Sequence, residues 1–386
     1  MPTIEIHGQC APGFEPVKEA FADLFESAGE VGASCSVYVK GELAIDLWAG
    51  STNQAGDAWR QDTLVNVFSV SKAVTAICVH KAVELGLLDL TRPVANYWPE
   101  YGCNGKKQTL VSWLLNHKAG QPAMKTPLPG EALYDWERMT ATLASEEPWW
   151  EPGTKHGYHM ISYGWLVGEV FRRAVGVSVG QFLREEIAGA LGLDMYFGVA
   201  EKDFSRVAEL QAASQLPEPG RVSLFNHVMT NPGSLTAAAL TNPLTIMNGA
   251  NTDDWRKAEI PSANLHSTAA ALATLFGKVA GKEGVLSDAS IVNCHQEQSM
   301  GEDPVLLTTT RFGPGFMLQQ PGNIEAEFGP GPNAFGHPGA GGALAFADPD
   351  RDLGFAYAMN QMGPYVLIDP RPRALVDALY RCLPAI

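Results

Sequence analysis

Strand-like sequence lies at both ends of this chain, and a long stretch without it lies between them. Near the start, residues 33–39 and 42–49 are β-like runs separated by Lys40-Gly41, a pair typical of a hairpin. The C-terminal third contains four more such runs, at 312–319, 334–337, 343–347 and 353–360. This arrangement predicts one antiparallel sheet that is assembled from both ends of the chain.

Helical patterns supply the layers that would cover this sheet. Three segments with helical spacing lie beside the strand-like runs, at 14–28, 267–279 and 371–382. Further helices are predicted in the middle of the chain, at 110–117, 136–145, 161–175 and 179–191. We therefore predict an α+β fold with an α/β sandwich subdomain, residues 1–88 and 255–386, and a mainly helical subdomain, residues 89–254. An active site is expected between the two layers.

Composition narrows the classes of function. The chain has 386 residues, of which 46% are hydrophobic and 18% charged, which suits two globular subdomains with a shared interface. A formal net charge of −15 argues against nucleic acid or an anionic membrane as partner. The chain has no apolar run of membrane-spanning length and its start lacks a secretory leader pattern, so we expect a soluble, cytoplasmic protein. Six cysteines without C-x-x-C spacing indicate neither a metal site nor a disulfide framework.

A serine stands where a short extended run, residues 64–68, turns into a long helical pattern that ends near Gly86. Ser69 and Lys72 are three residues apart and would share one face of that helix. A helix N-terminus favours negative charge, and a lysine buried among apolar neighbours can serve as a base. The pair therefore suits a nucleophile and its activator, although a serine at this position is more often only an N-cap.

Two loops contain the other groups that acyl transfer would need. Tyr158, in the segment 151–160, could exchange a proton with Ser69 if a nearby cation lowered its pKa. Residues 335–342 are rich in glycine, so the N–H of Ala340 could pair with that of Ser69 as an oxyanion hole. The ordinary alternatives are a packing tyrosine for the first loop and a plain bulge or turn for the second.

Two other patterns are better explained by structure than by chemistry. Ser178 lies in a G-x-S-x-G sequence, but it follows a helix rather than a strand, so we interpret it as the N-cap of the next helix. His156 and His159 lack a third ligand at suitable spacing, so no metal site is predicted.

Taken together, the motifs resemble the serine β-lactamase and penicillin-binding-protein superfamily, and most closely its family VIII carboxylesterases, relatives of class C β-lactamases. Ser69 and Lys72 match the S-x-x-K motif, Tyr158 opens the second motif, and His337-Pro338-Gly339 matches the third, H-x-G in many of the esterases. Residues 115–120 and 151–153 resemble flanking family sequence. The resemblance extends from about residue 15 to 383 and implies a β-lactamase/transpeptidase-like fold.

The resemblance implies a serine carboxylesterase that forms an acyl-enzyme on Ser69 and uses neither a cofactor nor a metal. Lys72 and Tyr158 would move the protons, with the choice of base left open, and the N–H groups of Ser69 and Ala340 would hold the oxyanion. Further contacts with substrate or with Tyr158 are assigned to His337, Gly339 and Trp150. The expected partner is a small-molecule ester, and the sequence leaves open whether the chain forms a homo-oligomer.

Departures from the family pattern bear on the substrate. Met160 occupies the third place of the second motif, where β-lactamases have Asn or Ser, and His337 replaces the lysine of their third motif. A histidine is largely neutral at pH 7, so a fixed cation for a β-lactam carboxylate is missing. These changes favour short-chain neutral esters, with weak β-lactam hydrolysis at most. The alternatives are a β-lactamase, a D-amino-acid amidase or an acyltransferase on the same scaffold, or a non-catalytic binding protein.

Overall fold

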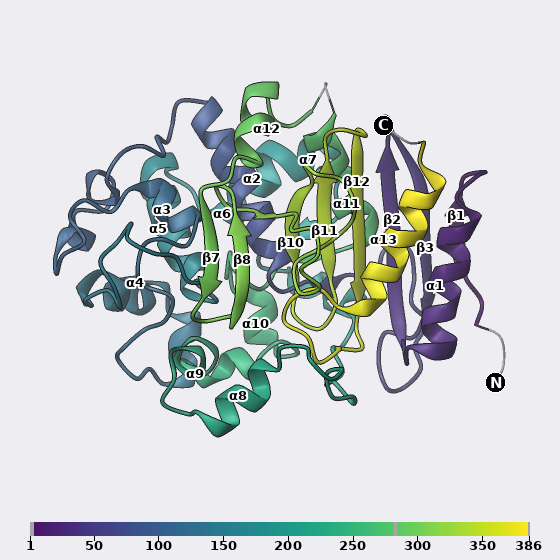
Figure 1. Ribbon diagram of the computed structural model, residues 1–386, viewed down its shortest axis with the longest axis horizontal. Helices are drawn as coiled ribbons and strands as arrows, with labels where there is room; N and C mark the ends of the chain where they lie inside the picture. The colour runs from purple at the N-terminus through teal and green to yellow at the C-terminus, as the bar shows by residue number, and fades with distance from the viewer. Residues whose placement is uncertain (1–3, 282–283, 385–386) are drawn as a thin grey trace.

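A nine-stranded antiparallel sheet occupies the centre of the computed structural model, which describes residues 4–281 and 284–384 (Figure 1). The strands follow the order β1-β3-β2-β12-β11-β10-β9-β8-β7 across the sheet. Their bounds are β1 His7–Cys10, β2 Gly32–Val39, β3 Glu42–Gly50, β7 Ser299–Asp303, β8 Thr308–Phe312, β9 Met317–Leu318, β10 Phe335–Pro338, β11 Leu344–Asp348 and β12 Leu353–Met359. The predicted antiparallel sheet from both ends of the chain is confirmed, because β2 pairs directly with β12.

Helices cover both faces of this sheet, which explains why β2 and β12 are buried along almost their whole length. On one face, α1 (Glu15–Ser27) and α13 (Pro370–Cys382) lie side by side (Figure 1). They cover large side chains such as Phe355 and Tyr357. On the other face, α11 (Ala269–Ala280) packs against small ones such as Ala356. Small residues let the helix approach closely: a Cβ on Gly354 would lie 2.1 Å from the backbone N of Gly277.

The middle of the chain is mainly helical and lies beside the sheet (Figure 1). Its helices are α3 Val111–Leu115, α4 Trp136–Ser145, α5 Ser162–Val175, α6 Val179–Phe182, α7 Gly189–Leu191, α8 Leu224–Thr230, α9 Leu235–Thr241 and α10 Asp253–Lys257, and α12 Asp288–Cys294 follows α11. A small sheet joins β4 Val65–Asn66, β6 His266–Ser267 and β5 Met195–Tyr196. Helix α2 (Val70–Glu84) contacts both α5 and β10, so its first turn lies where the helical part meets the large sheet.

Some expectations for local structure need correction. The single strand predicted at 312–319 is two strands, β8 and β9, because a tight turn interrupts it: the Gly313 N–H donates to Phe316 O, and Gly315 has φ +99°. The sequence does not predict strands β1 and β7, since neither has an alternating apolar pattern. Within residues 4–281 and 284–384, no helix is long and apolar enough to cross a membrane.

Candidate active site

Ser69 lies at the entrance to α2, in a turn with unusual backbone geometry. Phe68 before it has φ +42°, a left-handed conformation that is rare for a bulky residue and is often found at functional sites. In the described part of the chain the Ser69 side chain makes no N-cap hydrogen bond. Its Oγ lies 3.1 Å from Lys72 Nζ instead, so the N-cap alternative does not describe this serine.

Lys72 is fully buried and has no acidic partner within the described residues. Its Nζ lies 2.7 Å from Met160 O and 2.9 Å from Ser262 O, in addition to Ser69 Oγ. Burial holds the pKa of Lys72 well below its ordinary value. A neutral amine has two N–H groups and one lone pair, so the two carbonyls can take the hydrogens while the lone pair faces the serine hydroxyl. The arrangement can therefore accept the Ser69 proton.

Tyr158 lies against the Lys72 amine and is also buried. Its ring centroid is 4.8 Å from Lys72 Nζ, and its hydroxyl is 3.4 Å from His337 Nε2. Burial raises the pKa of Tyr158, and a hydrogen bond with Ser69 opposes that effect only in part. The direction is opposite to the one expected from a nearby cation, so the phenol holds its proton and can act as a donor.

His337 is fixed as a neutral imidazole with a defined tautomer. Its Nδ1 is 2.7 Å from Pro338 O, a carbonyl that can only accept, so Nδ1 bears the hydrogen. The lone pair of Nε2 then faces the Tyr158 hydroxyl. Burial lowers the pKa of His337 to about 3. The third motif therefore supplies a hydrogen-bond acceptor for Tyr158 and no cation.

The glycine-rich turn after β10 lies directly against the Ser69 turn. A Cβ on Gly339 would lie 2.3 Å from Val67 O, so only glycine permits this approach. Among the described residues, the N–H groups of Ser69 and Ala340 donate no backbone hydrogen bond, and both residues are partly exposed. Two free N–H groups beside a serine hydroxyl can hold an oxyanion.

The structure does not bring Trp150 into this cluster. Within the described chain, Trp150 has no polar or aromatic contact with Ser69, Lys72 or Tyr158. Its indole N–H donates to Lys155 O, and its ring lies against Gly157, where a Cβ would be only 2.7 Å away. Trp150 supports the loop that leads to Tyr158.

The remaining candidates have structural roles. Ser178 is the N-cap of α6, where it accepts from Gln181 N. His159 is held between Gln121 N and Gly157 O, and His156 bonds to Thr310 Oγ1. No group of three or more His, Cys, Asp or Glu side chains that could hold a metal ion occurs in residues 4–281 and 284–384.

Several groups at the site could not be found by sequence reasoning. The two carbonyls on Lys72, from Met160 and Ser262, are backbone atoms and leave no signal in residue type. Asp303 is buried at the end of β7, and its two oxygens accept from Tyr158 N at 3.1 and 2.9 Å. His117 packs on the Tyr158 ring at 4.9 Å, and its Nδ1 accepts from His159 N. Of these, His117 and Met160 lie in segments that resemble family motifs, but residue type alone does not show their contacts at the site.

The chain is similar to several known proteins over almost its whole length. A family model described as Beta-lactamase matches residues 17–379. The chain is similar to the crystal structure of a family VIII carboxylesterase, with a TM-score of 0.87, 36% identity, and coverage of 98% of this chain and 100% of that one. A penicillin-binding-protein homolog from Caulobacter crescentus gives a TM-score of 0.87 at 35% identity, with the same coverage. The Esterase/beta-lactamase LipL of Mycobacterium tuberculosis (strain ATCC 25618 / H37Rv) is 30% identical over 94% of this chain and 85% of its own length.

Proposed function

The chain belongs to the beta-lactamase family, and we propose that it is a serine carboxylesterase that hydrolyses short-chain esters through an acyl-enzyme on Ser69. Its membership confirms the superfamily and the β-lactamase/transpeptidase-like fold predicted from the sequence. The similarity to these proteins shows that the protein is an esterase/β-lactamase-like hydrolase. The acyl-enzyme on Ser69 is supported chiefly by Lys72. Burial lowers the pKa of this lysine, and its Nζ lies 3.1 Å from Ser69 Oγ.

In acylation, Ser69 Oγ bonds to the ester carbonyl carbon while its proton passes to the lone pair of Lys72. The negative charge on the carbonyl oxygen is held by the N–H groups of Ser69 and Ala340. When the bond to the alcohol breaks, Tyr158 donates its phenolic proton to the leaving oxygen, and the Lys72 ammonium restores the phenol. Water then replaces the alcohol, and the same two groups take and return its proton in deacylation.

The charge state of the site supports a neutral ester as substrate. His337 is uncharged, and the Met160 side chain supplies neither an amide nor a hydroxyl. A carboxylate-bearing β-lactam would find no fixed cation at this motif. We therefore expect β-lactam hydrolysis to be much slower than ester hydrolysis. A D-amino-acid amidase and an acyltransferase would use the same acyl-enzyme and differ only in the leaving group or the acceptor.

The test is p-nitrophenyl butyrate hydrolysis followed by intact mass, with Ser69→Ala and Ser178→Ala compared with the wild type. We expect an added acyl mass on the wild type and on Ser178→Ala, and none on Ser69→Ala. Turnover that survives in Ser69→Ala would overturn the assignment of the nucleophile. Nitrocefin and an added alcohol acceptor are run beside the ester. A larger kcat/KM for nitrocefin than for the ester would favour the β-lactamase alternative, and capture of most acyl groups by the alcohol would favour an acyltransferase.

A further inference from the structure

The turn that contains Ala340 is held by hydrogen bonds at its other peptide groups. Gly339 N donates to Ala343 O at 2.6 Å, and Gly342 N donates to Gly339 O at 3.1 Å. Gly341 N donates to Tyr365 O at 2.8 Å, which fixes the plane of the Ala340–Gly341 peptide. Among the described residues, the Ala340 N–H is thus left free, whereas the N–H groups of Gly339, Gly341 and Gly342 are all engaged. The Ala340 N–H shares a peptide plane with Gly339 O. Gly339 O accepts from Gly342 N, which in turn shares a peptide plane with Gly341 O, so the direction of the Ala340 N–H depends on what holds Gly341 O.

Gly341 O accepts two hydrogen bonds, and the shorter one comes from a buried arginine. Arg371 Nη2 lies 2.6 Å from Gly341 O, and Gly363 N lies 2.7 Å from it. The guanidinium also packs against the next residue, since a Cβ on Gly342 would be 2.7 Å from Arg371 Nη2. Arg371 therefore contacts the turn both by a charge-assisted hydrogen bond and by direct packing.

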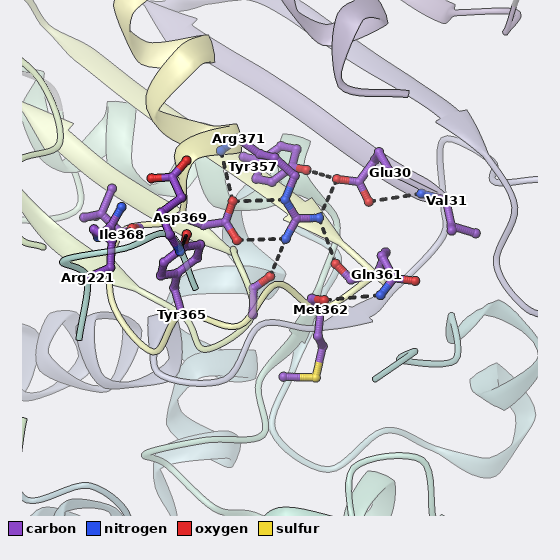
Figure 2. A network of polar contacts seen from close by, with 12 residues as sticks. Glu30, Val31, Arg221, Tyr357, Gln361, Met362, Tyr365, Ile368, Asp369 and Arg371 are labelled. Atoms are coloured by element: carbon purple, nitrogen blue, oxygen red, sulfur yellow. Dashed lines mark hydrogen bonds and ion pairs between the residues drawn. The ribbon is translucent and has the colours of Figure 1, made fainter. Parts of the chain in front are cut away.

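All the N–H groups of this guanidinium have acceptors (Figure 2). Nε donates to Asp369 Oδ1, and the second hydrogen of Nη2 is donated to Asp369 Oδ2, each at 3.0 Å. Nη1 donates to Glu30 Oε2 at 2.9 Å and to Gln361 O at 2.8 Å. With every donor used, the planar group has one orientation, and that orientation aims Nη2 at Gly341.

The two carboxylates that fix Arg371 are themselves buried and held. The Glu30 side chain has 0% exposure and the Asp369 side chain 3%. Tyr357 donates its hydroxyl to Glu30 Oε2, and Asp369 caps α13 by accepting from Arg371 N. Buried ion pairs add little net stability compared with apolar packing, but here they fix the orientation of the guanidinium because every donor is paired. A network of this kind at the far side of the oxyanion turn suits a positioning role.

We propose that Arg371, held by Glu30 and Asp369, is a positioning residue that sets the direction of the Ala340 N–H toward the oxyanion. The inference rests on the proposed function, because it assumes that Ser69 forms a tetrahedral intermediate. Lysine cannot replace this arginine: an ammonium has no planar fork, so it cannot bind Asp369 in a bidentate manner and reach Gly341 O at the same time. Loss of the contact tilts the turn and weakens the oxyanion bond without removing it.

The test compares Arg371→Lys with Arg373→Lys, a matched control on the same helix. Arg373 pairs with Asp377 and Glu327 at 2.9 and 3.3 Å and has no hydrogen bond to residues 339–342 in the described chain. Removal of one oxyanion donor costs about 10²–10³-fold in kcat, so its misplacement in Arg371→Lys should cost about 10–10²-fold, with KM within about threefold of wild type. Affinity for a trifluoromethyl ketone, which forms a tetrahedral adduct on serine, should fall by the same factor as kcat/KM. Arg373→Lys should lower thermal stability without changing either quantity.

Two further measurements distinguish the positioning role of Arg371 from a loss of stability and from a wrong choice of substrate. If Arg371→Lys does not fold, Glu30→Gln keeps the arginine and should lower kcat in the same direction by a smaller factor. The rate of Ser69 labelling by a p-nitrophenyl phosphonate is measured for every variant, since it reports the oxyanion hole even if the wild type turns over no ester. Absence of wild-type ester turnover would overturn the proposed function. Wild-type rates of labelling in both Arg371→Lys and Glu30→Gln would overturn the positioning role.

Discussion

Replacing Lys72 by methionine removes the proposed base and keeps an unbranched side chain in the same space. The change deletes the proton acceptor 3.1 Å from Ser69 Oγ, together with the donors to Met160 O and Ser262 O. General bases contribute about 10²–10⁴-fold, so kcat/KM for p-nitrophenyl butyrate should fall by that factor, equivalent to about 2.7–5.5 kcal/mol in the barrier. The orphaned carbonyls cost about 1–3 kcal/mol each in stability, which loss of the desolvated amine offsets in part.

A control on the same helix separates loss of the base from movement of the neighbouring segment. Thr75, one turn after Lys72, donates its hydroxyl to Pro261 O at 2.7 Å. Thr75→Val should therefore destabilise the same segment, residues 261–262, by about 1–3 kcal/mol and leave kcat/KM close to that of the wild type. A comparable loss of kcat/KM in both variants would mean that Lys72→Met acts through distortion of that segment.

The pH profile of the wild type decides between the two candidate bases. Burial lowers the pKa of Lys72 well below 10.5, and the active form is the neutral amine. Activity should therefore rise as pH rises through the folded pKa and reach a plateau well before pH 10.5. Burial raises the pKa of Tyr158 above 10.0, so a phenolate base would place the rising limb above pH 10. A limb in that range, or a Lys72→Met variant within about tenfold of wild type, would refute the assignment of Lys72.

Two other predictions concern the support of the site. Asp303→Asn should lower kcat and cost about 1–3 kcal/mol in stability, because an amide cannot accept from Tyr158 N with both of its heavy atoms. Glu302→Gln, on the exposed neighbour, is the control. Equal kinetics in the two variants would contradict the prediction. Burial lowers the pKa of His159 and His337 to about 3, so the unfolded chain binds protons below pH 6.5 that the folded chain does not. Stability should therefore fall as pH drops from 6.5 toward 3, by about 2 kcal/mol per group at pH 5, as measured by urea unfolding at pH 7 and pH 5. In His337→Gln the loss of stability between pH 7 and pH 5 should be smaller by the contribution of one group, about 2 kcal/mol. An unchanged loss would rule out His337 as a contributor.

The parts of the fold that could be predicted are those with a strong local signal. The hairpin at Lys40-Gly41, the helix that follows Ser69 and the cap at Ser178 all depend on turn and capping chemistry within a few residues. Strand β7 has the polar sequence Ser299–Asp303, and only pairing with β8 makes it a strand. Its place in the sheet is a tertiary effect, and no periodicity in the sequence predicts it.

The candidate site also has features that the sequence predicts and features that depend on the tertiary fold. Ser69, Lys72, Tyr158 and His337 could be chosen because their side chains have the chemistry that acyl transfer needs, and the structure brings them together. The direction of the Tyr158 pKa could not be obtained, because it depends on how completely the fold buries the phenol. Aromatic character is the only signal that suggests Trp150, and its indole N–H contacts its own loop.

The pairing of β2 with β12 has a consequence for how the protein is made. β2 is an interior strand only after residues 353–359 have been synthesised, and until then one edge exposes unpaired backbone groups. Such long-range pairing raises the contact order, slows folding and prolongs exposure to aggregation. The Ser69 turn is synthesised early and the Ala340 turn that packs against it is synthesised late, so a nascent chain has the proposed nucleophile long before it has the proposed oxyanion hole. The proposed activity therefore requires synthesis to pass residue 340, because any shorter chain lacks one donor of the proposed oxyanion hole.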